Sequence, residues 1–290
     1  MFKGSIVALV TPFKNGAVDE KALSELIEWH IAEGTNGIVP CGTTGESATL
    51  TYEEHYGVIK TTVEVVNKRV PVIAGTGANS TEETIVMTRE AQRLGADAAL
   101  LVAPYYNKPS QEGLYRHYRA VAEAVDLPLV LYNVPGRTAV NILPQTVERL
   151  AEIENVVAIK EATGDMRQVS DVLRRCGERI TVLSGDDFTT YTLLALGGKG
   201  VISVTANVMP RDVSRMCALY EEGRYDDARQ LHFRLEPLNA AMFLETNPIP
   251  VKTALSMMGR TTAELRLPLC EMSEANKESL RRTLLSYGLV

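Results

Sequence analysis

The chain has 290 residues, of which 45% are hydrophobic and 23% charged, a balance that excludes an intrinsically disordered protein, a collagen-like repeat and a coiled coil. Its formal net charge of −6 at pH 7 argues against a general nucleic-acid binder, which would need clustered Lys and Arg. No uncharged apolar run reaches the roughly 18 residues of a membrane span, and the first residues lack a signal-peptide cleavage pattern.

The cysteines and histidines do not form a metal-binding motif. The four cysteines form no C-x-x-C pair, and the four histidines never approach an H-x-x-x-H spacing, so the usual zinc patterns are missing. These residues are Cys41, Cys176, Cys217 and Cys270, and His30, His55, His117 and His232. We therefore expect reduced cysteines, a cytoplasmic protein and no bound metal.

Eight short apolar segments rich in β-branched residues recur along the first 204 residues. Each is about four to eight residues long and mostly apolar on both faces, which is typical of buried parallel strands. They cover residues 5–10, 37–41, 70–74, 98–103, 127–133, 156–160, 180–184 and 200–204.

Helical patterns fill the intervals between these segments. Ser80 predicts a helix N-cap, Pro144 a first helical turn, and Gly34, Gly95 and Gly177 helix C-termini. Eight β-then-α units over residues 1–222 predict a closed (β/α)₈ TIM barrel, with an open doubly wound sheet as the alternative if one strand is miscounted. Residues 223–290 lack strand patterns and predict a C-terminal helical domain, with helices at 251–258 and 274–287.

In such a barrel the active site lies at the carboxyl ends of the strands, where one lysine stands out. Lys160 ends an apolar strand, and alternation places it on the same face as Val156 and Ala158. If that face points into the barrel, the amine is desolvated and free to attack a carbonyl. A strand-end lysine that extends to solvent is the alternative.

Other strand ends supply hydroxyls and a guanidinium. Tyr132 ends the strand before Lys160 and could shuttle protons, although this residue taken alone favours a tyrosine whose ring packs and whose hydroxyl finds a partner. Arg137 follows in a Pro-Gly loop and could hold a carboxylate, or could be a surface arginine. Thr43 and Thr44 lie in a glycine-containing loop suited to a carboxylate or phosphate.

Two further patterns are weak. Gly75-x-Gly77-x-x-Ser80 is a near miss for a dinucleotide-binding loop, on the third strand of the series. Asp186 and Asp187 lack the third ligand of a metal site and are expected to be solvated acids or a helix N-terminus.

Taken together, these strand ends resemble the pyruvate-dependent class I aldolase and lyase family that includes N-acetylneuraminate lyase and dihydrodipicolinate synthase. The resemblance covers essentially the whole chain. It rests on Gly42-Thr43-Thr44-Gly45-Glu46, Pro104-Tyr105-Tyr106, Tyr132-Asn133-Val134-Pro135, Ile159-Lys160-Glu161 and Asn247-Pro248-Ile249-Pro250-Val251-Lys252.

The resemblance implies an enzyme that condenses pyruvate with L-aspartate 4-semialdehyde to 4-hydroxy-tetrahydrodipicolinate, for diaminopimelate and lysine biosynthesis. Lys160 would form the imine with pyruvate, so no cofactor is needed. Arg137 favours the synthase, because neuraminate lyases of the family generally lack an arginine there. The implied proton relay is Thr43, Tyr132 and a Tyr106 donated across a subunit interface; the implied substrate contacts are Thr44, Arg137, Gly185 and Ile202.

The resemblance also implies a homotetramer, built as a dimer of dimers, and a lysine effector site at the dimer interface. The residues that match this site are Ser47, Ala48, His55, Asn79, Glu83 and Tyr105, whereas Tyr52 departs from the histidine of some strongly inhibited relatives. Neither nucleic acid nor a membrane is expected as a partner. The alternatives are another pyruvate-dependent lyase, acting on a sugar acid or a hydroxy-oxoglutarate, and a barrel that only binds ligands.

Overall fold

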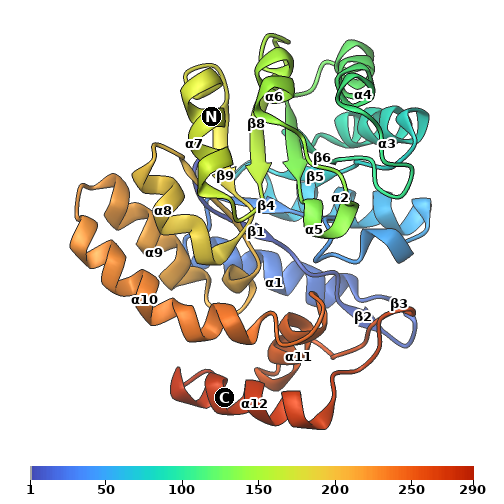
Figure 1. Ribbon diagram of the computed structural model, residues 1–290. Helices are drawn as coiled ribbons and strands as arrows, with labels where there is room; N and C mark the ends of the chain where they lie inside the picture. The colour runs from blue at the N-terminus through green and yellow to red at the C-terminus, as the bar shows by residue number, and fades with distance from the viewer. Residues whose placement is uncertain (1) are drawn as a thin grey trace.

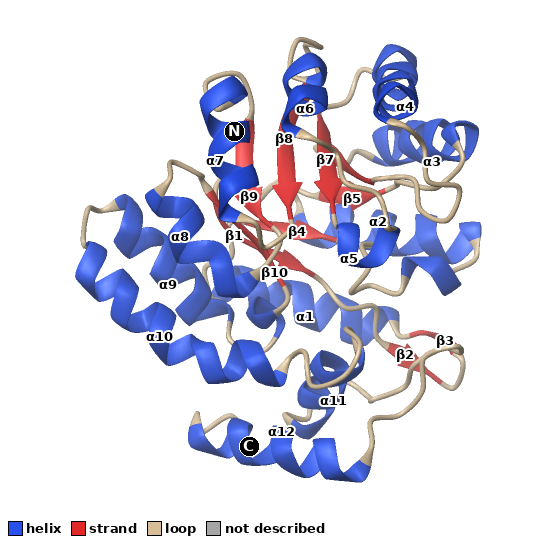
Figure 2. Cartoon of the chain, in the orientation of Figure 1, coloured by secondary structure: helices blue, strands red, loops and turns tan. Residues whose placement is uncertain are grey.

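The computed structural model describes residues 2–290, and within them eight parallel strands form a barrel surrounded by helices (Figures 1 and 2). The strands are β1 (Gly4–Ala8), β4 (Gly37–Val39), β5 (Ile73–Gly75), β6 (Ala98–Val102), β7 (Leu129–Asn133), β8 (Val156–Glu161), β9 (Thr181–Ser184) and β10 (Gly200–Ser203). Hydrogen bonding links them in the order β4-β1-β10-β9-β8-β7-β6-β5. A parallel bridge between Ile38 and Val72 closes the ring, so the predicted TIM barrel is confirmed and the open sheet is wrong.

Each predicted strand exists, but several of the predicted segments extend beyond the ends of the observed strands. Residues 70–72 precede β5 because Pro71 has no N–H, and the Val72 N–H donates to Asp97 Oδ2 at 2.9 Å. β1 ends at Ala8 because the Val10 N–H turns away to Asn207 Oδ1, at 3.1 Å. In both cases a side chain accepts the hydrogen bond that a longer strand would have used.

The helices of the barrel occupy the predicted intervals. They are α1 (Glu20–Ala32), α2 (Tyr52–Val66), α3 (Thr81–Leu94), α4 (Gln111–Ala124), α5 (Pro135–Thr138), α6 (Pro144–Leu150), α7 (Met166–Cys176), α8 (Thr190–Ala195) and α9 (Pro210–Glu221). Ser80 caps α3, Pro144 opens α6, and Gly95 ends α3 with a left-handed φ of 92°, as predicted. The short antiparallel pair β2 (Phe13–Lys14) and β3 (Ala17–Val18) was not predicted.

Apolar side chains inside the barrel and those between strands and helices form separate clusters. The cluster drawn almost wholly from strands includes Tyr132, Ala158 and Ile202, whereas Val156 packs with the helices outside. The predicted shared face of Val156 and Lys160 is therefore wrong. The cause is a register shift between Leu129 and Val130, where Leu129 pairs with Val156 but Val130 pairs with Ala158.

Three helices follow the barrel: α10 (Tyr225–Ala241), α11 (Ile249–Met257) and α12 (Glu274–Ser286), the last two close to the predicted 251–258 and 274–287. Pro237 lies inside α10. Leu238, Leu255 and Leu284 share one buried cluster with Leu9 of the barrel, and the division of the chain at residue 222 stays a prediction. Figure 2 shows α11 and α12 on the side toward which the β7 and β8 arrows point.

Two further properties concern residues 2–290 as a whole. None of the helices in this range combines the length and apolar character needed to span a membrane. All four cysteines are free thiols; Cys41, Cys176 and Cys217 are buried and Cys270 is exposed.

Candidate active site

Lys160 and Tyr132 are neighbours at the carboxyl ends of β8 and β7. They pair in register, and the Lys160 Nζ lies 4.1 Å from the centroid of the Tyr132 ring. Each residue is only 6% exposed, and Tyr132 belongs to the apolar cluster inside the barrel. The amine therefore lies against an aromatic face and away from bulk water, which is the placement that the nucleophile hypothesis required.

Gly185 provides the space for the Lys160 side chain. It follows β9, and a Cβ built on it would lie 3.0 Å from Lys160 Cε and 2.6 Å from the Ala162 Cβ. Ile202, 1% exposed on β10, belongs to the same interior cluster as Tyr132. A hydrogen atom at position 185 is thus a steric requirement of the lysine's position.

Asp187 is a buried carboxylate close to this lysine. Its oxygens accept hydrogen bonds from Ser203 Oγ at 2.5 Å and from the N–H groups of Val204 and Thr205 at 2.9 and 3.1 Å. Burial raises the pKa of Asp187, and these hydrogen bonds and the Lys160 charge oppose the rise. Asp187 is therefore not a solvated acid. The other expectation, a helix N-terminus, is confirmed, because Asp187 begins a short 3₁₀ turn that Asp186 caps by accepting from the Phe188 N–H.

A cavity of about 480 Å³ opens beside the lysine-bearing end of the barrel. Thr43 and Arg137 line it, together with Asn247 from the segment before α11. Asn247 Nδ2 donates to the buried Thr44 Oγ1 at 3.0 Å, and Arg137 Nη2 donates to the Asn247 carbonyl oxygen at 3.0 Å. Asn247 thus brings together Thr44 and Arg137, the two residues predicted to bind carboxylates. Lys160 and Tyr132 lie inside the barrel and are not among the described lining residues of the cavity.

Most residues of the predicted effector site line the same cavity: Ser47, Ala48, His55, Glu83 and Tyr105. Asn79 is not among the described lining residues; its carbonyl oxygen accepts from Asn107 Nδ2 at 2.8 Å. Burial lowers the pKa of His55. Glu83 raises the pKa of Tyr52, which also faces this cavity.

Tyr106 stands apart from the other predicted catalytic residues. Its side chain is 90% exposed, and its backbone has the left-handed φ of 68°, which is uncommon for a residue other than glycine. Within this single chain the phenol therefore points into solvent and not toward Lys160.

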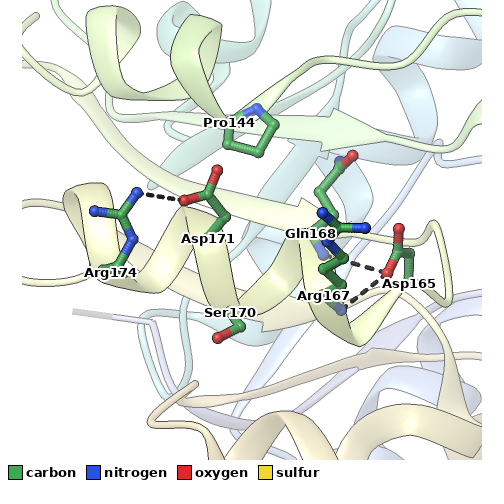
Figure 3. A pocket seen from close by; sticks show the side chains of 7 residues that line it. All are labelled: Pro144, Asp165, Arg167, Gln168, Ser170, Asp171 and Arg174. Atoms are coloured by element: carbon green, nitrogen blue, oxygen red, sulfur yellow. Dashed lines mark hydrogen bonds and ion pairs between the residues drawn. The ribbon is translucent and has the colours of Figure 1, made fainter.

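A second hollow, of about 630 Å³, lies along α7 (Figure 3). Its acidic groups are already paired, because Asp171 contacts Arg174 at 2.6 Å and the Asp165 carboxylate accepts from the backbone N–H of Arg167 at 2.8 Å. In the part of the chain that the structure describes, no group of three His, Cys, Asp or Glu side chains is placed to hold a metal ion. The cavity near Lys160 is the better candidate for chemistry.

The comparisons with known proteins agree with this fold and site. Residues 1–286 match the model of the dihydrodipicolinate synthetase family. A curated 4-hydroxy-tetrahydrodipicolinate synthase from Thermodesulfovibrio yellowstonii is 69% identical over 290 residues, the full length of both chains. The chain belongs to the dihydrodipicolinate synthetase family.

Solved structures of related enzymes superpose closely. A chloride-inhibited dihydrodipicolinate synthase from Acinetobacter baumannii, complexed with pyruvate, has a TM-score of 0.98 and 52% identity, with 100% of both chains covered. The Cyanidioschyzon merolae enzyme, with lysine bound, has a TM-score of 0.97 and 41% identity, covering 100% of this chain and 99% of its own.

Proposed function

We propose that this protein is an enzyme that condenses pyruvate with L-aspartate 4-semialdehyde to 4-hydroxy-tetrahydrodipicolinate, in diaminopimelate and lysine biosynthesis. Full-length relatives at 59–69% identity carry the corresponding name. The observation that carries the proposal is the buried Lys160 amine beside the Tyr132 ring, at the strand end where barrel enzymes keep their chemistry.

The proposed reaction uses the imine that the amine forms with pyruvate as an electron sink. Lys160 Nζ attacks the C2 carbonyl of pyruvate and water leaves, which gives an imine. Loss of a methyl proton gives the enamine, whose carbon attacks the aldehyde carbon while the aldehyde oxygen takes up a proton. The amino group of the condensed product then attacks the imine carbon, which closes the ring and releases the lysine amine.

The neighbouring side chains fit the proton transfers and the carboxylates of this scheme. Tyr132, Thr43 and Tyr106 would relay protons between the reacting atoms and solvent. Thr44 would hold the pyruvate carboxylate, and Arg137 that of the semialdehyde, through the fork geometry that guanidinium groups offer carboxylates. Gly185 and Ile202 would frame the imine. The pyruvate complex of the Acinetobacter baumannii relative supports the first substrate.

Assembly and regulation are part of the same proposal. A Tyr106 that is 90% exposed in one chain supports its use by a second copy, which requires at least a dimer. The proposed assembly is a homotetramer built as a dimer of dimers. The lysine-bound Cyanidioschyzon merolae relative supports a lysine effector site lined by Ser47, His55 and Glu83. Calorimetry that detects no lysine binding at millimolar concentration would remove the effector. The pathway and the absence of paired cysteines are consistent with a cytoplasmic enzyme.

Mass spectrometry after treatment with pyruvate and borohydride tests the imine. We expect one adduct on the peptide that contains Lys160, and none in Lys160→Ala. Lys199→Ala, which removes an exposed lysine next to β10, should keep the adduct and is the matched control. An adduct that persists in Lys160→Ala would contradict the assignment. Turnover of aspartate semialdehyde against sugar-acid aldehydes then separates this function from that of another pyruvate lyase.

A further inference from the structure

Asn247 has a buried oxygen without a partner in the candidate site. The residue is 5% exposed and lines the 480 Å³ cavity. Its other polar groups are used: Nδ2 donates to Thr44 Oγ1 and the backbone carbonyl oxygen accepts from Arg137 Nη2. Within residues 2–290, the side-chain Oδ1 has no hydrogen-bond partner. Since buried polar atoms in folded proteins are normally satisfied, this acceptor is available to a ligand.

The residue that carries this unpaired oxygen, Asn247, also contacts Arg137 through its backbone. The hydrogen bond from Arg137 Nη2 to the Asn247 carbonyl ties the two residues together at 3.0 Å. A guanidinium has five N–H donors. The bond to the Asn247 carbonyl oxygen is the hydrogen bond that the Arg137 guanidinium makes among the described residues, so its remaining donors have no partner there. A carboxylate that binds the remaining donors would therefore lie close to the Asn247 side chain.

The carboxylates of the cavity wall are less suited to this place. Glu46 is committed to Lys252, at 2.6 Å, and to the backbone N–H of Arg266, at 3.1 Å. Glu83 lies in the first turn of α3 and interacts with Tyr52, on the effector side of the cavity. Asn247 Oδ1 is an uncommitted acceptor on the residue whose backbone carbonyl oxygen binds Arg137.

We infer that Asn247 Oδ1 accepts a hydrogen bond from the α-ammonium group of the second substrate. The inference rests on the proposed function, in which that substrate is an α-amino acid aldehyde. The carboxylate and the ammonium are attached to one carbon, so Arg137 and Asn247 would recognise adjacent groups of the same molecule. Asn247 is then a specificity-determining residue that distinguishes amino acid aldehydes from aldehydes that carry only a carboxylate.

The test compares aspartate semialdehyde with 4-oxobutanoate, which has the same aldehyde and carboxylate but no ammonium group. The KM of aspartate semialdehyde and the inhibition constant of 4-oxobutanoate are measured on the wild type, Asn247→Ala and Asn247→Asp. A hydrogen bond to a charged group predicts that Asn247→Ala raises the KM about tenfold or more. The inhibition constant should change by less than about twofold, because the Arg137 contact remains.

Two variants separate this role from general damage to the site. Thr44→Val removes the partner of Asn247 Nδ2 but keeps Oδ1, so it should leave the ratio of the two constants unchanged even if turnover falls. Asn247→Asp keeps an acceptor of the same size, and its ratio should stay within about threefold of the wild type or favour the ammonium further.

The outcomes for the inference and for the proposed function differ. If wild type does not turn over aspartate semialdehyde with pyruvate, the proposed function is wrong. If it does, but Asn247→Ala raises both constants alike, raises neither, or changes only that of 4-oxobutanoate, the inference is overturned.

Discussion

Glu46 and Lys252 form an ion pair that is sealed from solvent, with 2.6 Å between Oε1 and Nζ and side-chain exposures of 1% and 0%. Glu46 ends the loop that carries Thr43 and Thr44, and its backbone has a left-handed φ of 53°. Lys252 belongs to α11, and its Nζ also lies 4.1 Å from the Phe13 ring centroid. The C-terminal helices thus fix the loop on which the candidate pyruvate contacts lie.

Breaking this pair should destabilise the protein strongly. Lys252→Met leaves Glu46 as an unpaired buried charge, and we expect a loss of about 3–5 kcal/mol in the free energy of unfolding. The double variant Glu46→Gln with Lys252→Met removes both charges and should recover a large part of that loss. Denaturant unfolding of the variants, at equal protein concentration, measures both effects. Equal losses in the single and double variants would show that the pairing is not the cause.

Gly185→Ala should block the imine without unfolding the barrel. The new Cβ would lie 2.6 Å from the Ala162 Cβ and 3.0 Å from Lys160 Cε, so the lysine must leave its position. We expect borohydride trapping of pyruvate to fall about tenfold or more, since displacement of a reacting group by about 1 Å is costly. Gly57→Ala is the control, because its Cβ would meet no atom within 4 Å inside α2. Wild-type trapping in Gly185→Ala would refute the steric account.

Arg137→Ala should impair the use of aspartate semialdehyde but not the formation of the pyruvate adduct. The guanidinium is proposed to hold the carboxylate of the semialdehyde and lies on α5, away from the described contacts of Lys160. We expect kcat/KM for aspartate semialdehyde to fall about a hundredfold or more, in line with the loss of a bidentate charged contact, while pyruvate still forms its adduct. Steady-state kinetics and adduct mass measure the two effects, and a defect limited to pyruvate affinity would contradict this role.

The fold was largely predictable because barrel strands are buried on both faces and read as short apolar runs. A proline, a side-chain hydrogen bond and an irregular strand pairing limited the accuracy of the predicted strand boundaries and faces. Pro71 and the Asp97 side chain delay the start of β5, and the irregular pairing at Leu129 and Val130 breaks the alternation that placed Val156. The β2–β3 pair was missed because two-residue strands carry too little periodicity to detect.

Site residues at the ends of strands were predictable from the sequence. Site residues on a segment far away in the sequence were much less predictable. Lys160 and Tyr132 follow directly from the register of adjacent strands. The sequence indicates Asn247 and Lys252 only as part of a segment that resembles the family, because their contacts with Thr44 and Glu46 join positions about 200 residues apart. Asp187 could have been suspected from its place after β9, but its burial depends on β10.

His30 should make stability depend on pH. It is fully buried in α1, and burial lowers its pKa from 6.5 to about 3. Between these values the unfolded chain binds one more proton than the folded chain, so the free energy of unfolding falls as the pH drops through this window. Its share of the slope is at most about 1.4 kcal/mol per pH unit.

His30→Leu should therefore flatten the dependence of unfolding on pH between about 6 and 4. His232→Leu, at a half-buried histidine whose pKa burial lowers less, serves as control and should change the slope less. Denaturant titrations at several pH values measure the slopes. An unchanged slope in His30→Leu would mean that the ring is already protonated in the folded protein.

Tyr106 should act in the site of a neighbouring subunit. Tyr106→Phe keeps Lys160 but lacks the phenol, whereas Lys160→Ala keeps the phenol but lacks the amine. If Tyr106 crosses the dimer interface, a mixed dimer has one complete site, formed by the Lys160 of one chain and the Tyr106 of the other. Random pairing of the two variants then gives about a quarter of the wild-type number of complete sites.

Coexpression of the two variants, each with a different affinity tag, allows the mixed assembly to be isolated. We expect activity well above that of either variant alone, since each homo-oligomer lacks one of the two groups in every site. Coexpression of Lys160→Ala with Tyr132→Phe is the matched control. Tyr132 pairs with Lys160 within one chain, so no exchange of subunits can rebuild that site. Absence of activity from the mixed Tyr106→Phe assembly would place the phenol in the site of its own chain or outside the chemistry. Activity restored in the control would show that the complementation is not specific to Tyr106.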